Sequence, residues 1–302
     1  MRRGISRLLR ETGRTLAAAA DLLEDAAGLN RVEKRTDFSQ CERPVLLLYG
    51  FFSTRRTFDV LERRLRRDGY GVFSLNLGGL WRSFNTRGID DLADLVRAKI
   101  ERIYARNPGM GPLTIVGHSK GGLIAAYYVK KLGGWRRTRT VVTLATPHQG
   151  TVAALLGLPI ALLARSVRQM LPGSAFLRAL RDGPWPGGVR LVSIWSREDR
   201  FAPFPAALVE THGLPHVANV ELTATHFEFL LSKRVYEVIR QEIRAGEETA
   251  PVQRGPLTAM RGGRVPGAHA GDPGPGTATD GDDRSPRAAA SLDASGQRHD
   301  FG

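Results

Sequence analysis

The chain has 302 residues, 42% of them hydrophobic, which is enough for one α/β domain of about 250 residues. Its net charge of +14 favours anionic partners, but no nucleic-acid-binding motif accompanies the charge, so we expect no nucleic-acid partner. The single cysteine, Cys41, excludes a disulfide framework and a thiolate metal site, and no apolar run is long enough to cross a membrane.

The first 40 residues are predicted to form a basic amphipathic helix followed by a linker. Apolar residues within Ile5–Leu23 recur at helical spacing, with arginines around them. The apolar run Leu16–Ala20 ends at Asp21 and is too short for a secretory signal, so we expect a cytoplasmic protein. Two interpretations stay open: an interfacial helix that gives peripheral membrane association, and a helix that docks on the domain, which the alanine content favours.

Strands alternate with helices through residues 41–246, which predicts one α/β domain with a mainly parallel central sheet and helices on both faces. The buried strands are recognised as short, continuous apolar runs. The predicted strands are Pro44–Tyr49, Tyr70–Asn76, Pro112–Val116, Thr140–Leu144, Val189–Trp195 and Val217–Leu222, and the predicted helices are Thr57–Arg67, Ile89–Tyr104, Leu123–Leu132 and Phe227–Arg244.

The insertion at 152–188 is predicted to be a helical lid. It is strongly apolar and indicates two helical pieces, Ala153–Met170 and Ser174–Leu180, separated by Leu171-Pro172-Gly173. An apolar lid would shape an acyl pocket and exclude water from it. The alternative is that these residues only pack the insertion onto the core, and both roles can hold together.

The C-terminal part divides into a closing helix and a tail. Helical spacing places Leu230, Leu231, Val235, Val238 and Ile239 on the inner face of the closing helix. Residues 247–302 are rich in Gly, Pro, Ala, Asp, Arg and Ser and almost without large apolar side chains. We expect this tail to be disordered, because it cannot offset the entropy cost of ordering.

The segment Ile115–Gly122, IVGHSKGG, carries the candidate nucleophile. It contains Gly-x-Ser-x-Gly, in which Ser119 occupies a tight turn between a buried strand and a helix. Side chains at the flanking glycines would crowd a backbone that is already strained. The predicted strand before Ser119 and the predicted helix after it supply the frame that a chance pentapeptide lacks.

The candidate base and acid follow the last two strands. His226 follows Val217–Leu222, where a loop can bring an imidazole to the hydroxyl of Ser119. Asp199 follows the preceding strand and is our choice to orient that imidazole, with Glu198 as the alternative. The order serine, aspartate, histidine is typical of α/β-hydrolases. The other histidines are His118, expected to point away from its serine, His148, His212, His216, and His269 and His299 in the tail.

Two backbone amides are predicted to form an oxyanion hole. One belongs to Lys120 at the start of the helix after the nucleophile, and the other to Phe51, which follows Gly50 after the first strand. The Lys120 side chain is expected to be solvated and to have no chemical part.

With these residues assembled, the chain resembles the α/β-hydrolase superfamily, and within it bacterial triacylglycerol lipases and esterases. The resemblance rests on VLLLYGF, VGHSKGGL, LATPHQGT, SREDRFAP and THFEFL, in that order. It departs in one place, because Tyr49-Gly50 replaces the usual His-Gly. The resemblance implies Ser119, Asp199 and His226 as a catalytic triad and no cofactor; some relatives hold structural calcium, for which we assign no acidic cluster here.

The predicted function is therefore hydrolysis of carboxylic esters, with an acyl ester or a lipid as substrate. Two alternatives stay open. A thioester or a polyester could be the substrate, because the same triad serves them all, or the protein could bind lipids or partners on a retained hydrolase fold.

Overall fold

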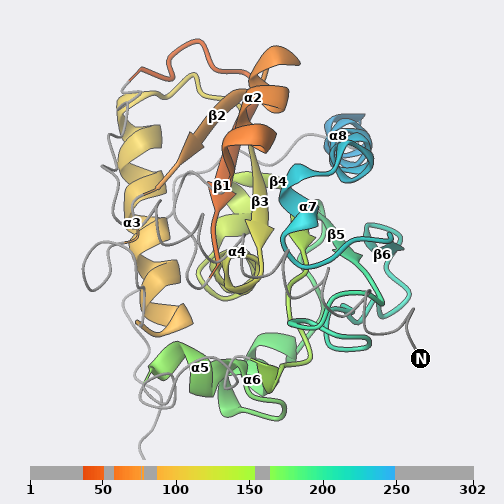
Figure 1. The fold of residues 1–302 in the computed structure, drawn as a ribbon. Coiled ribbons are helices and arrows are strands. Elements are labelled where there is room, and N and C mark those ends of the chain that lie inside the picture. Colours follow the sequence, from red (N-terminus) through yellow and green to blue (C-terminus); the bar gives the residue numbers. More distant parts are fainter. Residues whose placement is uncertain (1–36, 51–57, 76, 78–86, 154–163, 249–302) are drawn as a thin grey trace, which may run out of the picture. The chain divides into compact units, whose positions relative to one another are not determined.

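The computed structural model describes residues 37–50, 58–75, 77, 87–153 and 164–248 (Figure 1). The predicted N-terminal helix and the tail beyond residue 248 lie outside the described residues, so what the sequence predicts for them stays a prediction. The last helix continues to Glu248, two residues into the stretch that the sequence assigns to the tail. Glu247 is tied to the domain by an ion pair with Arg43 (Nε–Oε1, 2.8 Å).

Six strands form one sheet in which every neighbouring pair is parallel, in the order β2-β1-β3-β4-β5-β6. Each predicted strand is confirmed to within two residues at either end. The continuous apolar runs are explained by burial, since β1 and β3 are buried along their whole length. The strands are β1 (Pro44–Leu48), β2 (Gly71–Ser74), β3 (Leu113–His118), β4 (Thr138–Leu144), β5 (Arg190–Trp195) and β6 (Val217–Glu221).

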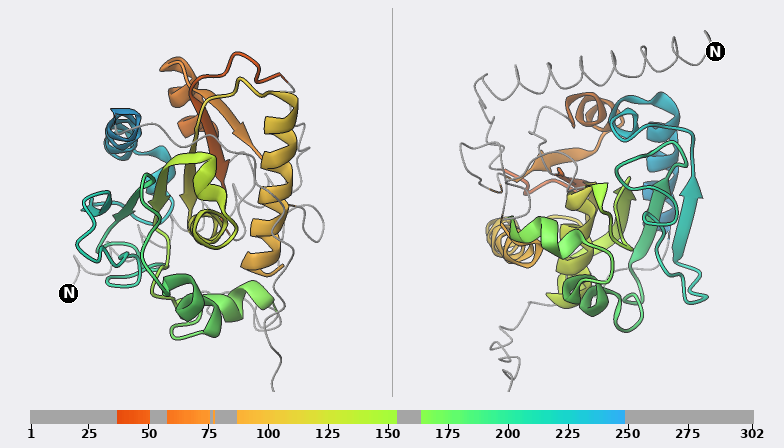
Figure 2. Two further views of the ribbon diagram at one scale, coloured as in Figure 1. Left: turned by 180° about the vertical axis from the view of Figure 1, so that it is seen from behind. Right: turned by 60° about the horizontal axis from the view of Figure 1, so that its bottom comes forward.

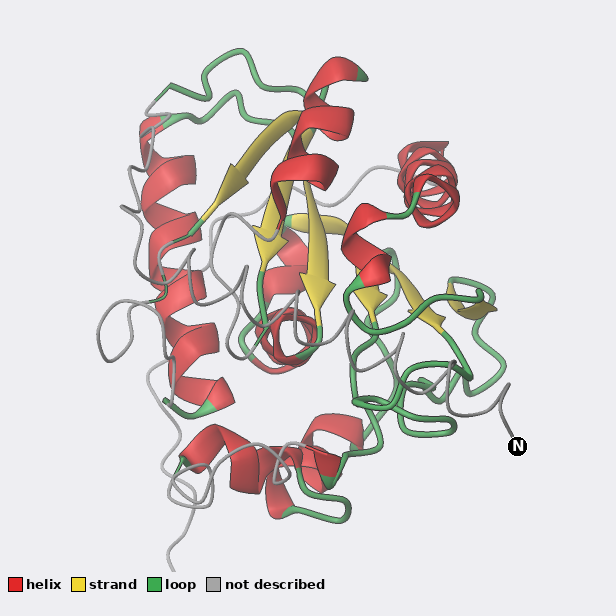
Figure 3. Cartoon of the chain, viewed as in Figure 1, coloured by secondary structure: helices red, strands yellow, loops and turns green. Residues whose placement is uncertain are grey.

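Helices cover both faces of the sheet, as the alternation predicts (Figures 2 and 3). Successive side chains of β1 point to opposite faces, so Leu46 packs with α3 and α4 while Leu47 packs with α2, α7 and α8. The helices are α2 (Asp59–Arg67), α3 (Ile89–Arg106), α4 (Lys120–Lys131), α5 (Arg165–Met170), α6 (Ala175–Arg181), α7 (Glu228–Leu231) and α8 (Lys233–Glu248), with a 3₁₀ turn η2 (Gly134–Arg136).

The predicted closing helix is divided in two. Ser232 has extended backbone angles (φ −63°, ψ 131°) and separates α7 from α8. This break resets the helical phase, so Leu230 is buried as predicted while the side chain of Leu231 is 54% exposed. The prediction for Leu231 is therefore wrong, although Val235 and Ile239 lie on the buried face.

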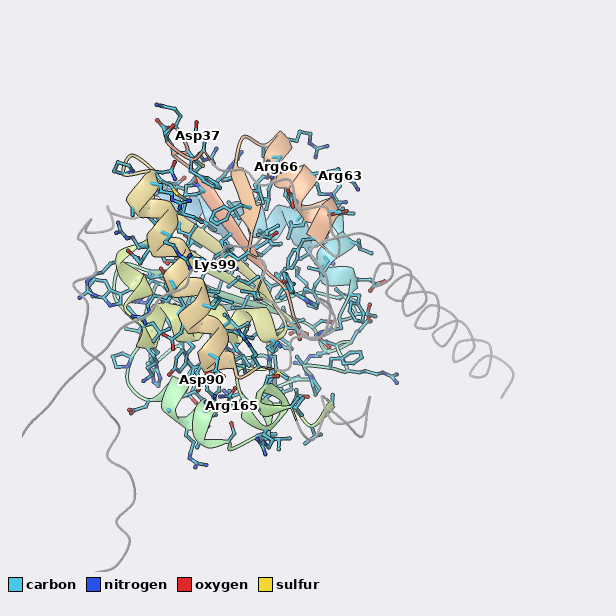
Figure 4. The ribbon with its side chains drawn as sticks, turned by 90° about the vertical axis from the view of Figure 1, so that its left-hand side faces the viewer. Asp37, Arg63, Arg66, Asp90, Lys99 and Arg165 are labelled. Carbon is cyan, nitrogen blue, oxygen red and sulfur yellow. The ribbon has the colours of Figure 1, made fainter. Side chains whose placement is uncertain are left out.

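The described part of the insertion packs on the core. The described end of its first predicted helix is α5, which begins at Arg165; residues 154–163, which the prediction also covers, lie outside the described residues. Apolar side chains of α5 and α6 belong to the same buried cluster as α3 and α4. Arg165 anchors α5 to the start of α3 through Asp91 (Nη1–Oδ2, 2.8 Å), beside Asp90 (Figure 4). The described insertion thus has the packing role, and a lid function stays a prediction.

Candidate active site

Ser119 occupies a strained turn between β3 and α4. Its backbone angles are φ 55° and ψ −125°, a conformation that costs a residue with a side chain about 1–3 kcal/mol. A Cβ on Gly117 would lie 2.6 Å from Gly122 Cα, and one on Gly121 would lie 2.0 Å from Leu48 O. Both obstacles are backbone atoms, so only glycine fits at these positions. The close packing keeps Ser119 in its strained conformation.

The structure describes one part of the predicted oxyanion hole, the part formed by Lys120. A Cβ on Gly50 would lie 2.8 Å from Ser119 Cβ, so the chain after β1 passes directly beside the nucleophile. Phe51 itself lies outside the described residues. Lys120 is the first residue of α4, where backbone amides point out of the helix and its dipole favours negative charge.

Asp199 and His226 form a buried hydrogen-bonded pair. The Nδ1 atom of His226 lies 2.9 Å from Asp199 Oδ2 and 3.1 Å from Oδ1. Asp199 also accepts hydrogen bonds from the backbone amides of Phe201 and Ala202. Burial has the largest single effect and raises the pKa of Asp199, but the hydrogen bond and charge of His226 and the two amides together outweigh it. The pKa of Asp199 is lowered as a result, which favours the carboxylate.

Of the two candidate acids, the structure brings Asp199 and not Glu198 to the histidine. The side chain of Asp199 is buried, whereas Glu198 is exposed on the surface of the same turn. Ser196 shapes this turn, because its hydroxyl accepts from the amides of Glu198 (3.0 Å) and Ala224 (3.1 Å). The same side chain therefore connects the loop of the acid to the loop of the histidine.

His118 connects the serine turn to the histidine. Its Nε2 lies 2.9 Å from the carbonyl oxygen of His226, and the two imidazole centroids are 4.6 Å apart. Ser119 is the next residue, so the nucleophile and the Asp199–His226 pair lie at one end of the sheet. Among the described residues no hydrogen bond joins the Ser119 hydroxyl to His226, and such bonds are often long before substrate binds. The sequence-based expectation that His118 points away from its serine did not include this contact with His226.

The Lys120 side chain is not solvated, contrary to the sequence-based expectation. It is 1% exposed, and burial lowers the pKa of its amine to about 7. Helical position explains this: α4 packs against the sheet along most of its length, and its first turn is covered as fully as its middle. Lysine is hydrophilic, so the sequence predicts an exposed side chain, and nothing in the local sequence indicates that Lys120 is buried.

Exposed apolar side chains lie next to the histidine. The ring of Phe201 is 4.9 Å from the His226 ring and 46% exposed. Thr151 Oγ1 donates to the Phe201 carbonyl (2.7 Å), which brings the neighbouring Val152, 60% exposed, to the same region. Phe201 thus presents an exposed apolar ring beside His226.

The remaining described histidines have other surroundings. His148 is buried against Thr143 (Nε2–Oγ1, 2.9 Å), and burial lowers its pKa to about 3. His212 is half-exposed beside Glu210. Both line a small cavity of about 60 Å³ that also contacts Trp185 and does not include Ser119. Because this cavity does not include Ser119, Asp199 or His226, we assign the site to Ser119 on its chemistry.

Within the described ranges there is neither a candidate metal site nor a candidate membrane span. No group of three His, Cys, Asp or Glu side chains is arranged to hold a metal ion. None of the helices in that part of the chain is both long enough and apolar enough to span a bilayer.

Comparisons with known proteins agree with this architecture. Residues 39–186 match the family model described as serine aminopeptidase, S33, a stretch that includes Ser119 and ends before Asp199 and His226. No curated protein matches the sequence.

Several solved structures share the fold at low sequence identity. Aspergillus fumigatus lipase B is 18% identical with a TM-score of 0.58, and the match covers 73% of this chain and 56% of the lipase. The mature form of a Bacillus licheniformis lipase is 16% identical with a TM-score of 0.53, covering 71% of this chain and 96% of the lipase. An esterase from Pyrococcus furiosus is 16% identical with a TM-score of 0.51, covering 70% and 83%. The chain therefore has the α/β-hydrolase fold, similar to that of these lipases and of the esterase.

Proposed function

We propose that the protein hydrolyses carboxylic esters, with Ser119 as nucleophile, His226 as general base and Asp199 as its partner. The main support is the buried Asp199–His226 pair, which His118 connects to the strained turn of Ser119. With Nδ1–H donating to the Asp199 carboxylate, Nε2 of the neutral imidazole is the nitrogen that can accept a proton.

The reaction proceeds in two acyl-transfer steps. Ser119 Oγ attacks the ester carbonyl while His226 takes the hydroxyl proton, and the carbonyl oxygen becomes an oxyanion. The carbon–oxygen bond to the alcohol then breaks, His226 returns its proton to the leaving oxygen, and an acyl-serine remains. Water repeats the sequence, releasing the acid and restoring the serine.

The oxyanion is proposed to be bound by the backbone amides of Lys120 and Phe51. The position of Lys120 at the start of α4 and the contact of Gly50 with Ser119 support this choice. Each such donor lowers the barrier by about 3 kcal/mol.

The substrate is proposed to carry an apolar acyl or alcohol group. Phe201, exposed beside His226, offers an apolar surface for it, and the exposed Val152 follows Thr151, which is hydrogen-bonded to Phe201. A thioester or a polyester would use the same residues. Because the matching family model is described as a serine aminopeptidase, the test also includes an amide substrate.

The test combines a fluorophosphonate probe with p-nitrophenyl esters of two to twelve carbons, a thioester, and an aminoacyl p-nitroanilide. We expect labelling and ester turnover by the native protein, and a loss of about 10⁵-fold in Ser119→Ala. Labelling that survives Ser119→Ala, or its absence from the native protein, would contradict the proposal and favour a binding protein on this fold. Faster turnover of the p-nitroanilide than of every ester would shift the reaction to amides.

Peripheral membrane association through the N-terminal basic segment is also proposed, on its sequence alone. Binding of the full chain to vesicles containing phosphatidylglycerol should weaken with salt and be lost when Arg2, Arg3 and Arg7 are replaced by Gln. Unchanged binding in that variant would exclude the segment as the anchor.

A further inference from the structure

His118 is a buried histidine for which the proposed acyl-transfer steps have no use. Its side chain is 1% exposed at the end of β3, one residue before the nucleophile. The acceptor of its hydrogen bond is the His226 carbonyl oxygen, so Nε2 must carry the proton. The other ring nitrogen, Nδ1, is buried with no hydrogen-bond partner among the described residues. The ring is therefore neutral, in one defined tautomer.

The hydrogen bond of His118 acts on the backbone of His226 and not on its ring. Asp199 holds the imidazole of His226 at Nδ1. This contact with the side chain does not by itself fix the position of the His226 backbone. The neighbouring loop is held at Ala224 by Ser196 Oγ (3.1 Å) and at Thr225 by Glu228 Oε2 (2.8 Å). The carbonyl of His226 is held by His118.

Rings enclose the His226 imidazole on several sides. Those of His118, Phe201 and Phe227 have centroids 4.6, 4.9 and 5.4 Å from it. Of these three, only His118 also donates a hydrogen bond to the residue it contacts, and only His118 is adjacent in sequence to Ser119. Any shift of β3 or of the His226 loop is therefore transmitted directly to the other.

We propose that His118 is a positioning residue, whose Nε2–H bond to the His226 carbonyl sets the distance between the base and Ser119. This inference rests on the proposed function. The physical reason for a large effect is that proton transfer tolerates little displacement, since a misplacement of 1 Å can lower a rate by about 10²-fold. A neutral ring suits this task, because a charged neighbour would oppose the imidazolium that forms on His226.

Two variants separate the hydrogen bond from the ring contact. His118→Gln places an amide N–H near the position of Nε2 without a ring, and His118→Phe keeps a ring without a donor. We expect kcat of His118→Phe to fall about 30-fold with KM unchanged, and His118→Gln to stay within about threefold of the native enzyme. Melting temperatures establish that both variants fold, and His118→Leu repeats the donor-free arm if His118→Phe does not.

The outcomes are distinguishable. The proposal is overturned if the donor-free variant turns over at the native rate, if both variants are equally slow, or if only KM changes. Fluorophosphonate labelling of native Ser119 is measured alongside. Native labelling with no difference between the variants removes the role of His118 and leaves the proposed hydrolase intact, whereas absence of native labelling removes the proposed function itself.

Discussion

Ser119 is held by backbone packing, whereas His226 is held by side-chain hydrogen bonds. On the nucleophile side, which comprises β3, Ser119 and α4, glycines bring backbone atoms so close that a Cβ at Gly117 or Gly121 has no room. On the base side, which comprises the turn of Asp199 and the loop of His226, the contacts come from Asp199 and from His118, which reaches across from β3. Packing of this kind resists local change, while a hydrogen-bonded loop depends on each of its donors. Substitutions at the packed glycines should therefore affect folding, whereas substitutions of the side chains that hydrogen-bond to His226 should affect activity.

The strongest test of the base side is Asp199→Asn. The amide no longer favours the tautomer with Nδ1–H, so kcat should fall about 10³–10⁴-fold while the protein stays folded. The matched control is Glu198→Gln in the same turn, which should remain within about threefold because Glu198 is exposed. Ester turnover and melting temperature are measured for both. Equal losses in the two variants would mean that the pair seen in the structure does not orient the base.

On the nucleophile side, Gly121→Ala should act through stability. Its Cβ would lie 2.0 Å from the Leu48 carbonyl oxygen, and relieving this contact should cost about 3 kcal/mol, lowering the melting temperature by about 6–12 °C. Gly187→Ala is the control, since nothing lies within 4 Å of its added Cβ, and should change stability by less than about 0.5 kcal/mol. Unfolding in urea gives both values. A Gly121→Ala variant that is stable but inactive would contradict the expectation that this substitution acts through stability.

Lys120→Met tests whether the nucleophile side uses only the backbone of this residue. The folded pKa of about 7 lies below the ordinary lysine pKa of 10.5, so the unfolded chain binds the additional proton between these pH values. The native protein therefore loses stability as the pH falls from about 10.5 to 7. The methionine variant should be more stable by about 2 kcal/mol at pH 7 and by less at pH 10, with activity within about threefold.

Thermal unfolding at both pH values and ester turnover at pH 7 measure the effect of Lys120→Met. A variant destabilised equally at the two pH values would show that the amine contributes more through its contacts than its burial costs. A loss of activity without a loss of stability would assign the side chain a chemical part.

The smallest effect is expected at Leu231, just beyond the His226 loop. Because Ser232 ends α7, the Leu231 side chain is 54% exposed, and Leu231→Ala should change the free energy of unfolding by less than about 0.5 kcal/mol. Leu230→Ala removes a side chain that is 1% exposed and should cost about 3 kcal/mol. Equal costs at the two positions would indicate one continuous helix through Ser232.

Much of the fold, and the Ser119 turn of the candidate site, could be predicted from the sequence. Strands such as Pro44–Leu48 are recognisable because burial on both faces requires an uninterrupted apolar run. The turn of Ser119 is recognisable because close backbone approach excludes every residue except glycine. These requirements act between residues near one another in the chain, so a local pattern records them.

The tertiary structure alone decided the rest. Asp199 and Glu198 are adjacent carboxylates, and only the direction of their turn brings one of them to His226. His118 contacts the backbone of a residue far along the chain, and Lys120 is buried despite its charge. A hydrogen bond between distant segments and the burial of a side chain depend on how β3, β6 and α4 pack together. No spacing within a short segment encodes that arrangement.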